Sequence, residues 1–216
     1  LSAPFRSQTT LKQKKTLPEG YYQVSGDDQH LFPLLISNEK EENFTVTLRA
    51  KGEVFFENND ENNQHLAFER QIAQYEQEID SIENIYIQAS HTLPQNMLRT
   101  LADSLMIKEK VILENADAYK LRIAAENKGK LLSNIAKFSR RIKSPSQYVQ
   151  SQKYIFQYYT QHLFDYYSFD DPRMAFYPKV SDKILEFSKI ILQMQAPDDT
   201  LAIQQLLHKA YGADDI

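Results

Sequence analysis

The chain of 216 residues contains no cysteine. Disulfide bonds, thiol catalysis, iron–sulfur clusters and cysteine-ligated zinc are therefore excluded. Only five glycines are present, and none of them belongs to a glycine-rich phosphate loop. No apolar run approaches the roughly 18 residues of a membrane-spanning helix. We therefore expect a soluble protein, either cytoplasmic or exported after N-terminal cleavage, since the chain starts at Leu1 and not at methionine.

Motifs for catalysis and metal binding are also missing. No two of the five histidines stand at metal-ligand spacing, and the Glu-x-x-His pairs of a di-iron bundle are absent. The Gly-x-Ser-x-Gly nucleophile elbow is absent too. His162 and Asp165 share a helical face, but an isolated pair of this kind is usually a structural hydrogen bond. The sequence therefore predicts no catalytic residue, no metal site and no cofactor, and it favours a non-enzymatic role.

A long amphipathic stretch organises the middle of the chain. Apolar residues between Phe68 and Ala89 follow one another at alternating spacings of four and three, which places them on one helical face. They are Phe68, Ile72, Tyr75, Ile79, Ile82, Tyr86 and Ala89. This pattern predicts a helix from about Asn63 to Ser90, roughly 42 Å long. It spans three heptads, which is the lower limit for a coiled coil.

A second helix is predicted to begin directly afterwards. Thr92 to Gln95 has the pattern of a capping box, with the Thr92 hydroxyl as the cap. A second apolar stripe follows and continues beyond Gly129, where the helix either kinks or ends. The short connection predicts an antiparallel helical hairpin. Its stripes either pack in the core of a helical bundle or leave a seam open for a partner helix or a second copy of the chain.

Residues 1–62 differ in texture from the rest. Residues 1–18 are basic and polar, and short strand patterns follow between Gly20 and Glu57. The alternation from Phe44 to Leu48, the turn at Gly52 and the apolar residues 54–56 predict a β-hairpin. We expect one small antiparallel sheet of three or four strands. The predicted fold class is α+β, with this N-terminal region at 1–62 and a helical bundle at 63–216.

The C-terminal third is rich in tyrosine. Ser144 and Pro145 have the pattern of a helix start, and the helix is expected to run to about Phe169. Its aromatic side chains either surround a central helix or form an aromatic surface for a partner. Two further helices are predicted, one after Tyr177–Pro178 and one that stops at Gly212.

Charge is distributed unevenly along the chain. Residues 127–164 contain seven lysines and arginines and no aspartate or glutamate, although the whole chain has a net charge of −4. Lys130, Lys137 and Arg141 are expected on one helical face. The candidate partner-binding residues are Lys130, Lys137, Arg140, Arg141, Lys143, Tyr148 and Tyr158. Such a basic patch is either a solvated face, a surface that docks on the acidic segment 39–61, or a binding site for phosphate groups.

Two functions from different classes remain. The favoured one is a protein–protein interaction or adaptor protein that acts through its long amphipathic helices, with a protein partner or a homo-oligomer. The alternative is a protein that binds an anionic surface, either nucleic acid or a phosphoinositide membrane, through residues 127–164.

Overall fold

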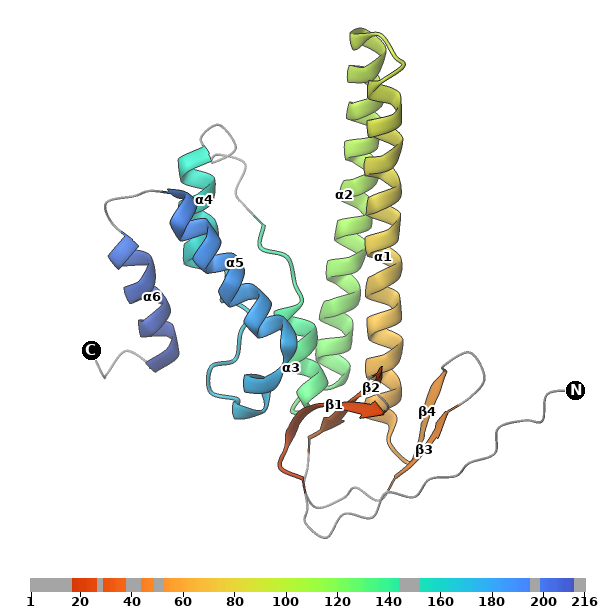
Figure 1. Cartoon of the computed structure of the whole chain (residues 1–216), viewed down its shortest axis with the longest axis vertical. Helices are drawn as coiled ribbons and strands as arrows, with labels where there is room; N and C mark the ends of the chain where they lie inside the picture. Colours follow the sequence, from red (N-terminus) through yellow and green to blue (C-terminus); the bar gives the residue numbers. More distant parts are fainter. Residues whose placement is uncertain are drawn as a thin grey trace, which may run out of the picture.

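The computed structural model describes residues 17–26, 29–37, 44–48, 53–143, 152–194 and 199–211. Four strands come first, and the remaining elements are helical, so the fold is α+β as predicted (Figure 1). In order they are β1 (Gly20–Gly26), β2 (Gln29–Ile36), β3 (Thr45–Leu48), β4 (Val54–Glu57), α1 (Asp60–Ser90), α2 (Gln95–Glu126), α3 (Leu131–Phe138), α4 (Gln152–His162), the 3-10 helix η3 (Pro172–Phe176), α5 (Pro178–Met194) and α6 (Asp199–Tyr211).

The strands form two separate antiparallel pairs in the part of the chain that the structure describes. β1 pairs with β2, and β3 pairs with β4. The predicted hairpin of β3 and β4 is therefore observed, with Val46 opposite Phe56, while its turn at Gly52 lies outside the described residues. The prediction of a single sheet of three or four strands is wrong, because each pair rests on its own contact with the start of α1.

Two consecutive asparagines in the first turn of α1 make these contacts. The amide of Asn62 accepts a hydrogen bond from the backbone N–H of Leu35 at 2.7 Å and donates one to its carbonyl at 2.8 Å. The amide of Asn63 pairs in the same way with Phe56 in β4, at 2.9 and 2.7 Å. Each side chain thus binds a strand as a neighbouring strand would, and together they fix both sheets to one helix end.

The helices α1 and α2 lie side by side and run in opposite directions (Figure 1). α1 starts at Asp60, slightly earlier than predicted, because the Asn59 side chain caps it by accepting from the Asn62 N–H at 3.0 Å. Near the base of the pair, the ring of Phe68 stacks on Tyr119 with centroids 5.9 Å apart. The pair is long and projects away from the sheets and the other helices.

The predicted capping box at Thr92 is wrong. α2 begins at Gln95 without a side-chain hydrogen bond to its first turn. The Thr92 hydroxyl instead lies 3.4 Å from the carbonyls of Gln88 and Ala89, and its backbone N–H donates to Ala89 at 3.0 Å. Thr92 therefore bonds back to the last turn of α1 and does not cap α2.

The second helix ends shortly before Gly129 and does not continue through it. α2 stops at Glu126, and Gly129 has a φ of +87°, a conformation that suits glycine because it has no Cβ. α3 then starts as a separate helix at Leu131. The apolar positions that continue the predicted stripe, including Leu131, Ile135 and Phe138, are buried in the main core.

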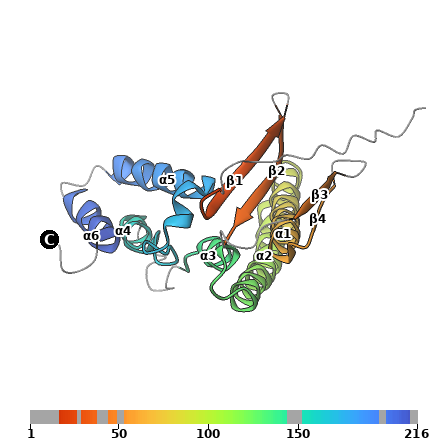
Figure 2. The same ribbon diagram turned by 90° about the horizontal axis from the view of Figure 1, so that it is seen from below.

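This core lies at the base of the helix pair. Seen from below, α3 lies between the α1–α2 pair and the C-terminal helices (Figure 2). The core residues come from β2, from α1, α2 and α3, from Ile142 after α3, and from the segment 163–187. They are Leu35, Phe68, Ile72, Ile123, Ala124, Leu131, Leu132, Ile135, Ala136, Phe138, Ile142, Leu163, Phe164, Met174, Tyr177, Val180 and Phe187.

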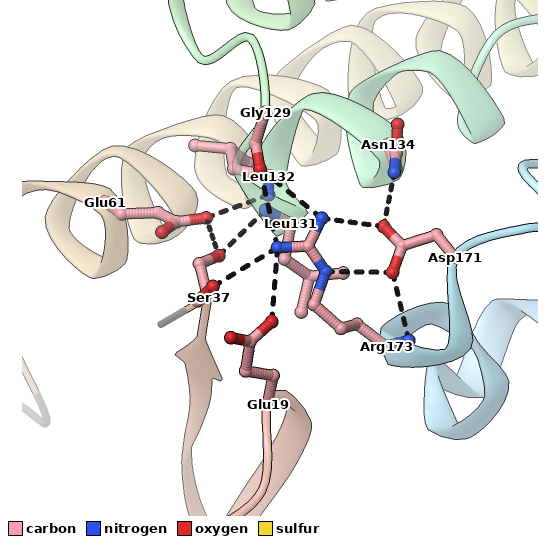
Figure 3. A network of polar contacts seen from close by, with 9 residues as sticks. All are labelled: Glu19, Ser37, Glu61, Gly129, Leu131, Leu132, Asn134, Asp171 and Arg173. Carbon is pink, nitrogen blue, oxygen red and sulfur yellow. Dashed lines mark hydrogen bonds and ion pairs between the residues drawn. The ribbon is translucent and has the colours of Figure 1, made fainter. Parts of the chain in front are cut away.

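Side chains from other elements satisfy the N-terminus of α3 (Figure 3). Glu61 accepts hydrogen bonds from the Leu132 N–H at 2.9 Å and from the Ser37 hydroxyl at 2.8 Å. The Ser37 oxygen in turn accepts from the Leu131 N–H at 2.8 Å. Free N–H groups and the helix dipole both favour a carboxylate at this end of a helix. α3 therefore depends on α1 and the end of β2 for its cap.

Arg173 joins this junction to the segment before α5 (Figure 3). Its guanidinium donates to both oxygens of Asp171, at 2.8 and 2.9 Å, and to the carbonyls of Gly129 and Ser37, at 3.4 and 3.3 Å. Burial alone would raise the pKa of Asp171, but the hydrogen bonds from Arg173 and Asn134 outweigh it and hold this pKa below its usual value. The carboxylate is therefore charged, and it orients the arginine.

Two lysines from other elements donate hydrogen bonds to carbonyls at the C-terminal end of α3. Lys120 donates to the Ser139 carbonyl at 2.6 Å, and Lys183 donates to the Phe138 carbonyl at 3.1 Å. Burial lowers the pKa of each ammonium group. Cations stabilise the C-terminal end of a helix dipole. This short helix is thus held at both ends by charges from other elements.

The C-terminal helices use most of their aromatic residues in packing. α4 ends at His162, earlier than the predicted Phe169, because Leu163 and Phe164 turn into the core. Tyrosines 158, 159, 166 and 167 and Phe169 are partly buried against the same core. Of the two alternatives for this segment, central packing is therefore the one observed for these residues. The predicted helix start at Ser144 lies outside the described residues.

Candidate interaction surfaces

The distal half of the helix pair, which is the part away from the sheets, exposes apolar side chains. The main core cluster ends near the base, where Phe68 and Ile72 are buried. Farther along the pair Leu105 is still buried, but Tyr86 on the α1 stripe is 41% exposed. The other exposed apolar residues of this part are Ile85, Ile87, Met97, Met106, Ile107 and Val111. Exposed apolar side chains in one region mark interaction surfaces more often than isolated ones do.

A groove runs between the two helices in this distal half. α1 lines it with Glu78, Ser81 and Ile82, and α2 lines it with Ile107, Lys108, Val111 and Ile112. We call these seven residues the hairpin groove. Ile82 and Ile112 belong to the predicted stripes that face the other helix, yet they contact this open space. Ile107 and Val111 are 67% and 50% exposed beside it.

The predicted basic residues do not share one helical face. α3 is only eight residues long and ends at Phe138, so Arg141 lies beyond it, while Lys130 precedes its first turn. Lys137 is on the helix, and all three are exposed. The prediction assumed that one helix continued through this segment, and the turns on either side of α3 invalidate it.

Arg140 and Lys143 are paired within the protein. The guanidinium of Arg140 donates to both oxygens of Asp117 in α2, at 2.9 and 3.2 Å, and it lies 4.3 Å from the centre of the Tyr166 ring. Lys143 lies 3.4 Å from the same carboxylate. The hydrogen bond from Arg140 is the main cause that lowers the pKa of Asp117. Asp117, which sequence reasoning missed, therefore neutralises part of the basic segment.

Two other cations line a shallow hollow beside α3. Lys128 and Lys137 border it together with Arg140, Asp165 and Tyr166. Among the described residues, neither lysine forms an ion pair. Tyr158 is elsewhere, half-buried on α4, with its ring 4.2 Å from that of His162. Tyr148 lies outside the described residues.

His162 and Asp165 form the predicted pair and hold two helices together. His162 Nδ1 contacts an Asp165 oxygen, and the other Asp165 oxygen accepts from Lys209 in α6. Burial raises the pKa of Asp165, but hydrogen bonds from Lys209 and His162 outweigh it and lower this pKa. Lys209 also donates to the Gln161 carbonyl at 2.8 Å. The pair therefore attaches α6 to the end of α4, a contact for which the sequence near His162 holds no signal.

Comparison of the chain with protein-family models, with curated proteins and with solved structures gives no match. Within the described ranges, no three histidine, aspartate or glutamate side chains gather where they could bind a metal ion. Also within those ranges, every helix is too short or too polar to cross a membrane.

Proposed function

We propose that the protein is a non-enzymatic interaction protein that binds another polypeptide through the hairpin groove. The observation that supports this proposal is the apolar side of the distal helix pair, where Ile82 and Ile112 meet open space and Ile107 and Val111 are exposed. Burying such a side chain contributes up to about 1.5–3 kcal/mol. Two amphipathic helices side by side offer a groove into which a further helix can pack.

Neighbouring residues on α2 provide the test. Ile107 and Met106 are exposed to similar extents, at 67% and 63%, but only Ile107 lines the groove. A photo-crosslinking amino acid at position 107 should form a defined covalent complex with a polypeptide in cells, and the same amino acid at position 106 should not. The proposal would be contradicted if neither position crosslinks, or if both positions crosslink with equal yield.

A second candidate function is binding to an anionic surface through residues 127–164. The observation that favours it is that Lys128 and Lys137 border one hollow without an ion pair among the described residues, with Lys130 and Arg141 also exposed nearby in the chain. Phosphate groups would meet these cations, and binding would weaken as salt rises because counterions are released.

Lys137 and Arg141 are the residues to change, because Arg140 already forms an ion pair with Asp117. Replacing both by glutamate should abolish binding to a single-stranded oligonucleotide or to vesicles that contain a phosphoinositide, measured at two salt concentrations. Lys189→Glu on α5 changes an exposed lysine elsewhere and serves as the control. Unchanged binding in the double variant would eliminate this candidate.

A further inference from the structure

We infer that the hairpin groove is the contact surface of a homodimer, in which a second copy of this chain packs its own groove against the first. This inference rests on the proposed function and names the partner. In the assembly, the four distal helix segments would form a four-helix bundle. The two copies lie parallel along their lengths, with both tips at the same end.

The packing of the distal half is incomplete with two helices alone. Each stripe residue there has one neighbouring helix. Leu105 is buried all the same, but one side of the seam between α1 and α2 remains open at Ile82 and Ile112. In a four-helix bundle, every helix buries its stripe against two neighbours. A second hairpin provides two such helices at once and would cover Ile107 and Val111 as well.

The charges of the groove select a second copy over an unrelated apolar helix. Glu78 of α1 and Lys108 of α2 are the two charged residues that line it. Glu78 accepts a hydrogen bond from Gln74 at 3.2 Å, and Lys108 has no ion pair among the described residues. The surface therefore holds one acid on one helix and one base on the other, which is the arrangement that a twofold-symmetric contact can pair twice.

The heights of these two residues fix the orientation. Glu78 lies 12 residues before the end of α1 at Ser90, and Lys108 lies 13 residues after the start of α2 at Gln95. At 1.5 Å per residue both are therefore about 18–20 Å from the tip. A twofold axis along the length of the hairpin leaves the distance of every residue from the tip unchanged. It also places α1 of one copy against α2 of the other. Glu78 of each copy then faces Lys108 of the other copy, so the contact contains this pair twice.

The size of the face predicts a weak dimer. Two helices, each about 10 Å across and about 25 Å long in the distal half, present a face of roughly 500 Å². A standard stable interface buries about 800 Å² on each partner. We therefore expect a dissociation constant in the micromolar range, so that monomer and dimer both populate solutions of the whole chain at about 1–100 μM.

Sedimentation velocity of the whole chain over this concentration range tests the inference. Glu78→Lys and Lys108→Glu should each weaken the dimer at least about tenfold, because each places like charges opposite each other in both contacts. The double variant should return to within about threefold of the original dissociation constant, because the pairs are restored in reverse. Met106→Glu adds an acid at a position about as exposed as Ile107 that does not line the groove. This variant should leave dimerisation unchanged.

Circular dichroism of each variant shows whether its helices are intact, so that a loss of folding is not taken for a loss of dimer. A chain that stays monomeric throughout, or a double variant as weak as either single one, would overturn the homodimer. If position 107 nevertheless crosslinks to a different protein, the groove is an interaction site and only the homodimer is wrong. If neither dimer nor crosslink is found, the proposed function fails with it.

Discussion

Asn62 in α1 holds Leu35 in β2 by a pair of hydrogen bonds: its amide oxygen accepts from the Leu35 N–H at 2.7 Å, and its amide nitrogen donates to the Leu35 carbonyl at 2.8 Å. The two residues are 27 positions apart, and Asn62 is 1% exposed while Leu35 is fully buried. Both hydrogen bonds are therefore shielded from bulk water. This single amide therefore couples the first sheet to the helix pair.

Asn62→Ala is expected to lower the free energy of unfolding by about 2–3 kcal/mol, because it leaves a buried N–H and a buried carbonyl without partners. Asn84→Ala on the exposed side of the same helix should change it by less than about 0.5 kcal/mol. Urea denaturation followed by circular dichroism measures both. Equal effects of the two substitutions would show that the Asn62 pairs contribute little to stability.

The stripe of α1 predicts a gradient of stability along the helix pair. Phe68 is fully buried near the base, whereas Tyr86, on the same stripe, is 41% exposed. Phe68→Ala should cost about 3–5 kcal/mol because it leaves a cavity in the core. Tyr86→Ala should cost less than about 1 kcal/mol, measured by denaturant midpoints at a protein concentration low enough to keep the chain monomeric. Similar costs would mean that the distal half is packed as tightly as the base.

Local periodicity was sufficient to predict α1 and the start of α5. The four-and-three spacing from Phe68 to Ala89 permits one helical face, and Pro178 after Tyr177 is well suited to a first helical turn. The β3–β4 hairpin was equally accessible, because alternation over a few residues is a local signal. These features depend only on neighbours in the sequence.

The failures concern contacts that a local sequence pattern does not specify. Thr92 satisfies the rule for a helix start, but the rule does not say that its hydroxyl can serve the end of the preceding helix instead. The acid-free segment 127–164 contains no partner for Arg140, and Asp117, its actual partner, lies 23 residues away on another helix. The open side of the hairpin groove could not be predicted either, because a stripe looks the same in sequence whether one helix or two helices cover it.

The pair of Arg140 and Asp117 predicts a dependence of stability on pH. The pKa of Asp117 is lowered in the folded protein, chiefly by the hydrogen bond from Arg140, relative to about 3.9 in an unfolded chain. A carboxyl group with a lowered folded-state pKa stabilises the protein above its unfolded pKa, and this contribution is lost as the pH falls through the folded pKa.

Asp117→Asn should therefore be less stable than the original protein by about 1.5–3 kcal/mol at pH 7. The difference should shrink as the pH falls below about 4, where the Asp117 carboxyl of the unfolded chain becomes protonated. Glu114→Gln, which removes an exposed carboxylate 3.9 Å from Lys110, is the control and should have little effect at any pH. A difference for Asp117→Asn that is constant with pH would refute the charge-based account.

The junction at the N-terminus of α3 is expected to depend on the planar shape of the Arg173 guanidinium and not on its charge alone. Its guanidinium pairs with two oxygens of Asp171 and reaches the carbonyls of Gly129 and Ser37, and the side chain is 16% exposed. A lysine keeps the charge but lacks the planar fork, so it cannot make these contacts at once. Arg173→Lys should therefore lower the free energy of unfolding by about 1–3 kcal/mol.

The same substitution at Arg122 provides the matched control, because Arg122 forms an exposed ion pair with Glu126 on the surface of α2. Arg122→Lys should change stability by less than about 0.5 kcal/mol, since the charge is kept and exposed pairs contribute little. Urea midpoints of both variants, fitted with a common slope, decide between two views of Arg173. If both variants match the original protein, charge alone is sufficient at Arg173. If only Arg173→Lys is destabilised, the fork itself joins the end of β2, the start of α3 and the segment before α5.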